Sequence, residues 1–116
     1  MIQRLQVATR YSEAAIHNGV VYLAGQVPND VTQGIEGQTA EVLTMIDDLL
    51  AQAGSSKDHL LTVTIYLTNM ADYAGMNKVW DGWLNQGFAP PRACVQTSLA
   101  NPLWKVEIVV VAAQLR

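Results

Sequence analysis

The sequence Lys105-Val106-Glu107-Ile108-Val109-Val110-Val111-Ala112-Ala113, close to the C-terminus, restricts how this chain can fold. Successive side chains of a strand point to opposite faces of a sheet, and here both faces are apolar apart from Glu107. This pattern is typical of a strand that is covered on both sides. We therefore predict that this run lies inside the protein.

Turn and helix signals on either side of this run divide the rest of the chain. Asn18-Gly19 between two apolar runs predicts a β-hairpin. Apolar residues at helical spacing, followed by Gly54 or Gly87, predict two helices, and alternating apolar residues predict further strands. The predicted strands are 11–17, 20–25, 60–67, 92–99 and 104–114, and the predicted helices are 38–53 and 71–86.

This order predicts an α+β fold in which both helices cover one face of a single sheet. A chain of 116 residues is the size of one domain, residues 1–116. Two helices leave the second apolar face uncovered, so we expect it to meet another copy of the chain. Charged residues make up only 15%, against about 25% in an average soluble domain, and this low share favours the same interpretation.

Charge and composition exclude several classes of function. The net charge is −3 and the seven basic residues are scattered, which argues against nucleic acid or an anionic membrane as partners. One cysteine, Cys94, excludes an internal disulfide and a multi-cysteine zinc site. The sequence has no transmembrane stretch and no secretion signal at its start, so we expect a soluble, cytoplasmic domain without metal or cofactor.

Two charged residues interrupt the apolar strands near the C-terminus, Arg92 and Glu107. We expect the odd positions of 92–99 to face the core, which leaves Arg92, Cys94 and Gln96 on the other side. One interpretation is a structural Arg92–Glu107 ion pair on neighbouring strands. The other is a site for a small anion, in which Arg92 binds a carboxylate and Glu107 orients or activates water.

Cys94 lies two residues from Arg92, where a thiolate nucleophile is one possible role. No histidine stands in a motif that would activate it, so a small buried side chain is the better interpretation. Trp80 and Trp83, three residues apart, indicate packing of a helix on the sheet rather than a platform for stacking bases.

Five short motifs, spread along the chain, carry a resemblance to a known family. They are Ala24-Gly25-Gln26-Val27-Pro28, Val63-Thr64-Ile65-Tyr66-Leu67, Met76-Asn77-Lys78-Val79-Trp80, Pro91-Arg92-Ala93-Cys94-Val95 and Val106-Glu107-Ile108. Through them the chain resembles the Rid family, the reactive intermediate deaminases of YjgF type, over nearly its whole length. The resemblance implies a chorismate-mutase-like sheet with two helices on one face. It also implies a homotrimer around a central β-barrel, with ligand sites between subunits.

The resemblance also implies an activity. Studied members of the family hydrolyse reactive 2-imino acids and their enamine tautomers, such as 2-aminoacrylate, to 2-oxo acids and ammonia. By position, Arg92 matches the arginine that binds the substrate carboxylate, and Glu107 matches the acid that handles the attacking water. Cys94 and Gly25 match residues whose main chain lines the pocket, and Tyr11 matches a pocket tyrosine from the neighbouring subunit.

Some features depart from the family pattern or leave other functions open. Ala24 stands where a serine is common, and Asn77 matches a family asparagine with a structural role. A trimer that binds 2-oxo acids without catalysis is an alternative to the deaminase. A holdase or a nuclease-like translation inhibitor is a third possibility, but the lack of a basic surface speaks against a nuclease.

Overall fold

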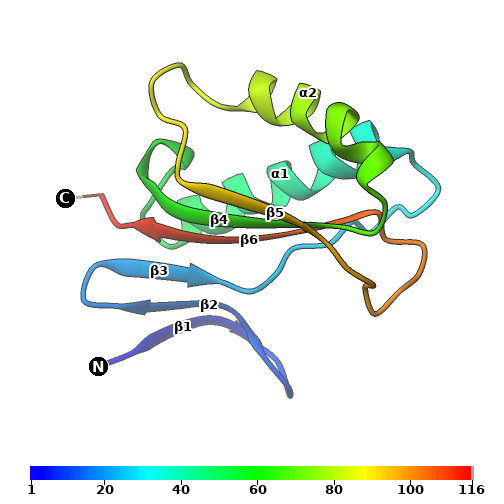
Figure 1. The fold of residues 1–116 in the computed structure, drawn as a ribbon. Helices are drawn as coiled ribbons and strands as arrows, with labels where there is room; N and C mark the ends of the chain where they lie inside the picture. Colours follow the sequence, from blue (N-terminus) through cyan, green and yellow to red (C-terminus); the bar gives the residue numbers. More distant parts are fainter. Residues whose placement is uncertain (116) are drawn as a thin grey trace.

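The apolar run at the C-terminus forms strand β6 (Val106–Ala113), which lies between β3 (Val20–Leu23) and β4 (Leu60–Leu67) in the middle of a six-stranded sheet (Figure 1). The computed structural model describes residues 1–115. The strand order is β1-β2-β3-β6-β4-β5; β4 and β5 are parallel, and all other neighbours are antiparallel. The other elements are β1 (Gln3–Val7), β2 (Ser12–His17), α1 (Ile35–Gln52), η1 (Lys57–His59), η2 (Met70–Asp72), α2 (Tyr73–Trp83) and β5 (Arg92–Gln96).

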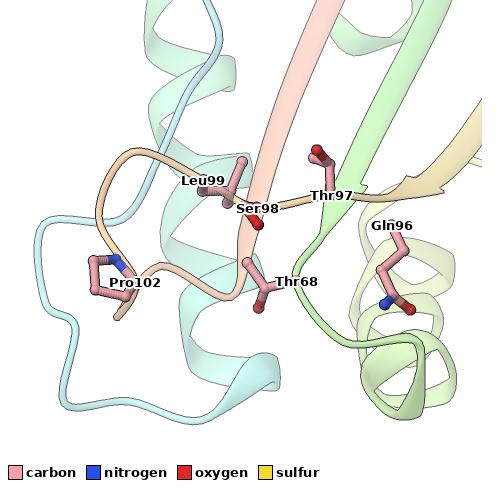
Figure 2. A pocket seen from close by; sticks show the side chains of 6 residues that line it. All are labelled: Thr68, Gln96, Thr97, Ser98, Leu99 and Pro102. Carbon is pink, nitrogen blue, oxygen red and sulfur yellow. The ribbon is translucent and has the colours of Figure 1, made fainter.

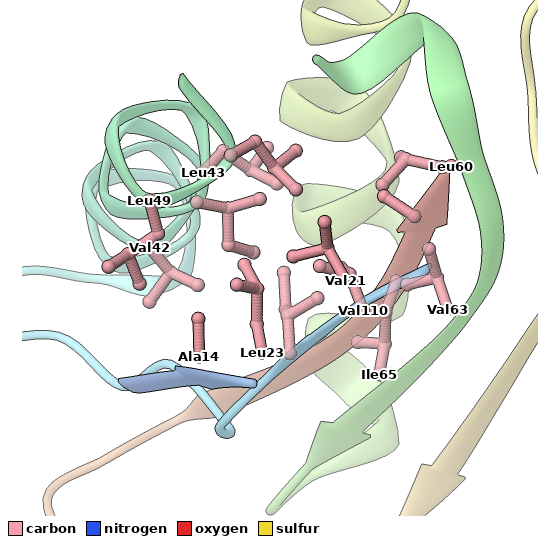
Figure 3. Packing of buried hydrophobic residues seen from close by; sticks show 14 of the residues in the cluster. Ala14, Val21, Leu23, Val42, Leu43, Leu49, Leu60, Val63, Ile65 and Val110 are labelled. Carbon is pink, nitrogen blue, oxygen red and sulfur yellow. The ribbon is translucent and has the colours of Figure 1, made fainter. Parts of the chain in front are cut away.

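Both helices lie on the same face of the sheet, as predicted, and the core lies between helices and sheet (Figures 1 and 3). Every second residue of β6 is buried there, from Val106 to Ala112. Helix α1 contributes the apolar side chains that its helical spacing predicted: Val42, Leu43, Ile46, Leu49 and Leu50. Gly75 lets helix α2 pack closely on α1. A Cβ at this position would come within 2.8 Å of Ile35 Cγ2, which is too close for an ordinary contact.

The hairpin predicted from Asn18-Gly19 is present. Both residues have positive φ, 52° for Asn18 and 77° for Gly19, as a two-residue turn of type I′ requires. The turn fixes the register of β2 on β3, with Ile16 opposite Val21.

Several element bounds differ from the prediction. Strand β1 was not predicted, because only two of its five residues, Leu5 and Val7, are apolar. It pairs with β2 at the edge of the sheet. Helix α1 starts three residues earlier, at Ile35. Helix α2 starts later than predicted because η2 precedes it, and it ends at Trp83. None of the helices within residues 1–115 combines the length and apolar character needed to cross a membrane.

The orientation of β5 was predicted incorrectly. Its register places Arg92 opposite Val63 and Cys94 opposite Ile65, both of which are buried on the helix-covered face. Ala93 and Val95 face the other way and are exposed. A parallel strand at the edge of a sheet is only partly covered by the helices, so its polar residues can face them without being buried. A smaller shift occurs in β4, where an irregularity between Leu60 and Thr62 turns Leu60 to the core instead of Leu61.

The face of the sheet opposite the helices is open in a single chain. On β6 it carries Val109 and Val111, which are half-buried, and Tyr22 on β3 lies opposite Val111 and is 49% exposed. We refer to this surface as the open face. An apolar surface at the centre of a sheet is the kind that oligomers bury.

We predict that Val111→Lys converts an oligomer of this chain to monomers. A lysine at the centre of the open face would leave an unpaired charge in the interface, at a cost of several kcal/mol per interface. Sedimentation velocity measures the change, circular dichroism checks the fold, and Ala40→Lys on the exposed side of α1 is the matched control. A wild-type protein that is already monomeric, or a Val111→Lys protein that stays assembled, would contradict the prediction.

Candidate functional site

Arg92 is held at the start of β5 by a group of side chains on α2. The Pro91 carbonyl accepts the Val63 N–H at 3.1 Å, which places the first residue of β5 beside β4. The Arg92 Nη2 then donates to Asn77 Oδ1 at 2.8 Å and to the Tyr73 hydroxyl at 3.3 Å. The guanidinium carbon lies 5.4 Å from the Trp80 ring centre and 5.9 Å from that of Tyr73. We refer to Arg92, Tyr73, Asn77 and Trp80 as the arginine cluster.

The spacing of the three α2 residues explains the cluster. Positions 73, 77 and 80 are separated by four and three residues, so their side chains lie on one side of the helix. Trp80 is buried, Asn77 is partly buried and Tyr73 is 41% exposed, so the guanidinium lies between the core and solvent. Within residues 1–115, the Nε and Nη1 of Arg92 have no hydrogen-bond partner. Each of these N–H groups can donate a charge-assisted hydrogen bond to an anion.

Cys94 lies on the same face as Arg92, two residues further along β5, and packs against the edge of the core. Partial burial raises the pKa of the Cys94 thiol, and the positive charge of Arg92 offsets this only in part. The thiol is therefore protonated at neutral pH. This agrees with a packing role for the side chain and argues against a thiolate nucleophile.

Glu107 lies on the open face, in a cavity of about 230 Å³ whose lining residues are Tyr66, Thr97, Leu99, Glu107 and Val109. We refer to this cavity as the glutamate cleft. Glu107 stands opposite Tyr66 in the β4–β6 ladder and is half-buried. Among residues 1–115 no lysine or arginine lies within ion-pair distance of its carboxylate. The cleft thus presents a carboxylate that is free to act on a ligand or on water.

Gly25 makes room for this carboxylate. The Gln26 N–H donates to the Ile108 carbonyl at 2.9 Å, and the Ile108 N–H donates back to the Gln26 carbonyl at 3.1 Å. These bonds hold the chain after β3 directly beside Glu107. A Cβ on Gly25 would overlap Glu107 Oε2 and come within 2.9 Å of its Cδ. A glycine is therefore required for the carboxylate to keep its place.

Tyr11 lies at the same end of the β2–β3 ladder as Gly25. The Ala24 N–H donates to the Glu13 carbonyl at 2.9 Å. Gly25 follows Ala24 directly, and Tyr11 lies two residues before Glu13. Tyr11 is 56% exposed. The structure therefore brings Gly25 to Glu107, and places Tyr11 at the same end of the hairpin as Gly25.

The structure does not bring Arg92 and Glu107 together, and the predicted ion pair between neighbouring strands is wrong. Strand β4 separates β5 from β6, which puts the two strands about 10 Å apart. The residues are also offset by three positions along β4, since Arg92 is opposite Val63 and Glu107 is opposite Tyr66; this adds about 10 Å. Their side chains leave opposite faces of the sheet.

Another cavity, of about 370 Å³, is lined by neither Arg92 nor Glu107. Figure 2 shows its lining at the point where β4 ends and the β5–β6 connection begins: Thr68, Gln96, Thr97, Ser98, Leu99 and Pro102. It shares Thr97 and Leu99 with the glutamate cleft, so the two hollows adjoin. The side chains around it supply hydroxyl and amide groups.

Sequence reasoning missed Tyr73, Tyr66 and Thr97 as site residues. The spacing of Tyr73 to Asn77 and Trp80, which places all three on one side of the helix, was a usable signal. Tyr66 and Thr97 come to the cleft only through the pairing of β4 with β5 and β6, which a single sequence does not reveal.

The fold and these two clusters define a small α+β protein with an arginine held by helix α2 and, within residues 1–115, a separate unpaired carboxylate. A family model described as Endoribonuclease L-PSP matches residues 1–114. The chain is 51% identical to a RutC family protein of Haemophilus ducreyi over 113 residues, which is 97% of each chain. It belongs to this family, whose members carry the names RutC, YjgF and Rid.

Solved structures agree with the fold. A member of the YjgF family from Neisseria meningitidis is 46% identical, with a TM-score of 0.98 over all of this chain and 97% of that one. A protein of the conserved Rid family from Yersinia pestis is 34% identical, with a TM-score of 0.85 over 92% of this chain and 90% of that one. The predicted family and the predicted α+β sheet are confirmed.

We predict that Gly25→Ala displaces the Glu107 carboxylate while the fold survives, because the overlap falls on the end of a flexible side chain. Any activity that depends on Glu107 should fall at least 10-fold, the lower part of the range for loss of an acid–base group. The measurement is turnover together with the melting temperature. Gly82→Ala, where a Cβ meets nothing within 4 Å, is the control. Unchanged turnover in Gly25→Ala would show that the carboxylate position is not critical.

Proposed function

We propose that this protein hydrolyses 2-imino acids and their enamine tautomers to 2-oxo acids and ammonia. The observation that carries the proposal is the arginine cluster, in which Arg92 is oriented by Asn77 and Tyr73 with its remaining N–H groups free. Such a guanidinium suits a small planar carboxylate. The family resemblance to the Rid deaminases supports the same reaction class.

We propose further that each complete site contains residues from two copies of the chain. Within one chain Arg92 and Glu107 lie on different strands and opposite faces, too far apart for one small imino acid to touch both. Tyr11 is further still, because three strands lie between β2 and β5, or about 19 Å at the usual strand spacing. A homotrimer that buries the open face would bring the arginine cluster of one copy to the glutamate cleft of the next.

The proposed reaction requires positioning and one proton shuttle. Arg92 binds the carboxylate of the protonated imine, and Glu107 accepts a proton from a water molecule as its oxygen attacks the imine carbon. Glu107 then returns that proton to the nitrogen of the resulting carbinolamine. As the carbon–nitrogen bond breaks, the carbinolamine hydroxyl gives its proton through Glu107 to the departing ammonia, so that a 2-oxo acid and an ammonium ion leave. The main chain at Gly25 and Cys94 lines the site.

The test is an imine-hydrolysis assay in which a threonine dehydratase supplies the imine and semicarbazide competes for it. We predict that wild-type protein accelerates hydrolysis and that Arg92→Ala lowers kcat/KM about 100-fold or more, because two charge-assisted hydrogen bonds are lost. Glu107→Gln should lower kcat by about 10²–10⁴-fold, the range for general acid–base catalysis. Sedimentation velocity checks that both variants keep the wild-type assembly.

A second measurement separates catalysis from simple binding. Titration with pyruvate should show binding to wild type and to Glu107→Gln, and none to Arg92→Ala. If the wild type binds pyruvate but does not accelerate hydrolysis of any imine supplied, the protein is a 2-oxo acid-binding oligomer instead. An Arg92→Ala protein with full activity would exclude the assigned role of Arg92.

A further inference from the structure

Tyr73 has a hydroxyl group that the fold itself does not need. It is the first residue of α2 and is 41% exposed, so its hydroxyl is not a buried group that requires a partner. Arg92 Nη2 already donates to Asn77 Oδ1 at 2.8 Å, against 3.3 Å to the Tyr73 oxygen. A phenylalanine would keep the ring over the guanidinium. The hydroxyl is therefore free to serve a ligand.

The bond to Arg92 determines what this hydroxyl can do. A tyrosine hydroxyl has one proton to donate and lone pairs to accept. Because the Tyr73 oxygen accepts a hydrogen bond from the Arg92 guanidinium, the Tyr73 O–H points away from Arg92. It can therefore donate to another acceptor. An anion on the free N–H groups of Arg92 would lie beside this proton, and the positive charge would disfavour a cation there.

We propose that Tyr73 is a second carboxylate-binding residue of the arginine cluster, its hydroxyl donating to the same carboxylate that Arg92 binds. The inference rests on the proposed function and adds a second residue to its carboxylate-binding site. A site with a guanidinium and a phenol on one carboxylate selects 2-imino and 2-oxo acids with the free acid group. It rejects esters and simple imines that lack this group.

The test is Tyr73→Phe, with Gly82→Ala on the same helix as the control, because a Cβ at Gly82 meets nothing within 4 Å. The measured quantities are the Kd of pyruvate and of methyl pyruvate, and the KM and kcat of imine hydrolysis. We expect the Kd of pyruvate and the KM to rise about 10-fold, as for loss of a hydrogen bond to a charged group. We expect kcat and the melting temperature to stay close to wild type, and the preference for pyruvate over its ester to shrink.

A second variant distinguishes the hydroxyl from the ring. If Tyr73→Phe binds pyruvate like wild type and only Tyr73→Leu binds weakly, Tyr73 acts by stacking on Arg92 and the proposal is wrong. If Tyr73→Phe has no effect while Arg92→Ala abolishes binding, Tyr73 is excluded and the proposed function stands. If wild type neither binds pyruvate nor hydrolyses imines, both are excluded.

Discussion

The structure depends on the strand β6, which is apolar on both faces in a chain whose two helices cover only one. On the helix side, Val106, Ile108 and Val110 are completely buried and form the centre of the core. On the other side, Val109 and Val111 remain half-exposed in a single chain. Burial of apolar surface is the main favourable term in folding and in association, so the second face favours contact with another molecule. The low share of charged residues fits this arrangement.

The same strand carries one of the two chemical groups of the candidate site, and β4 separates it from the other. Glu107 lies on β6 and points to the open face, whereas Arg92 lies at the sheet edge and points to the helices. Each group is well placed by its own neighbours: Asn77 and Tyr73 hold the guanidinium, and Gly25 leaves space for the carboxylate. Neither group alone provides the chemistry of imine hydrolysis. Assembly and catalysis are thus linked in our account, because burial of the open face is what would complete the site.

The fold was largely predictable from the sequence, and the site only in part. The period of the apolar residues predicted both helices and all strands except β1, in which only Leu5 and Val7 are apolar. The motifs around Arg92 and Glu107 pointed to the correct family. The predicted orientation of β5 was wrong. Its alternating apolar residues were expected to be buried, but β5 lies at the edge of the sheet, where they are exposed. The supposed Arg92–Glu107 pair failed for a related reason: order along the chain does not show that β4 lies between β5 and β6.

The most direct test of the central claim, that each site is shared between two copies, is complementation between inactive variants. Arg92→Ala and Glu107→Gln would be unfolded, mixed in equal amounts and refolded together. In a cyclic oligomer with random mixing, about one quarter of the sites combine an intact Arg92 with an intact Glu107 from the adjacent copy. Our account predicts recovery of about one quarter of wild-type activity under this symmetry. Activity no greater than that of the two separate variants would contradict a shared site.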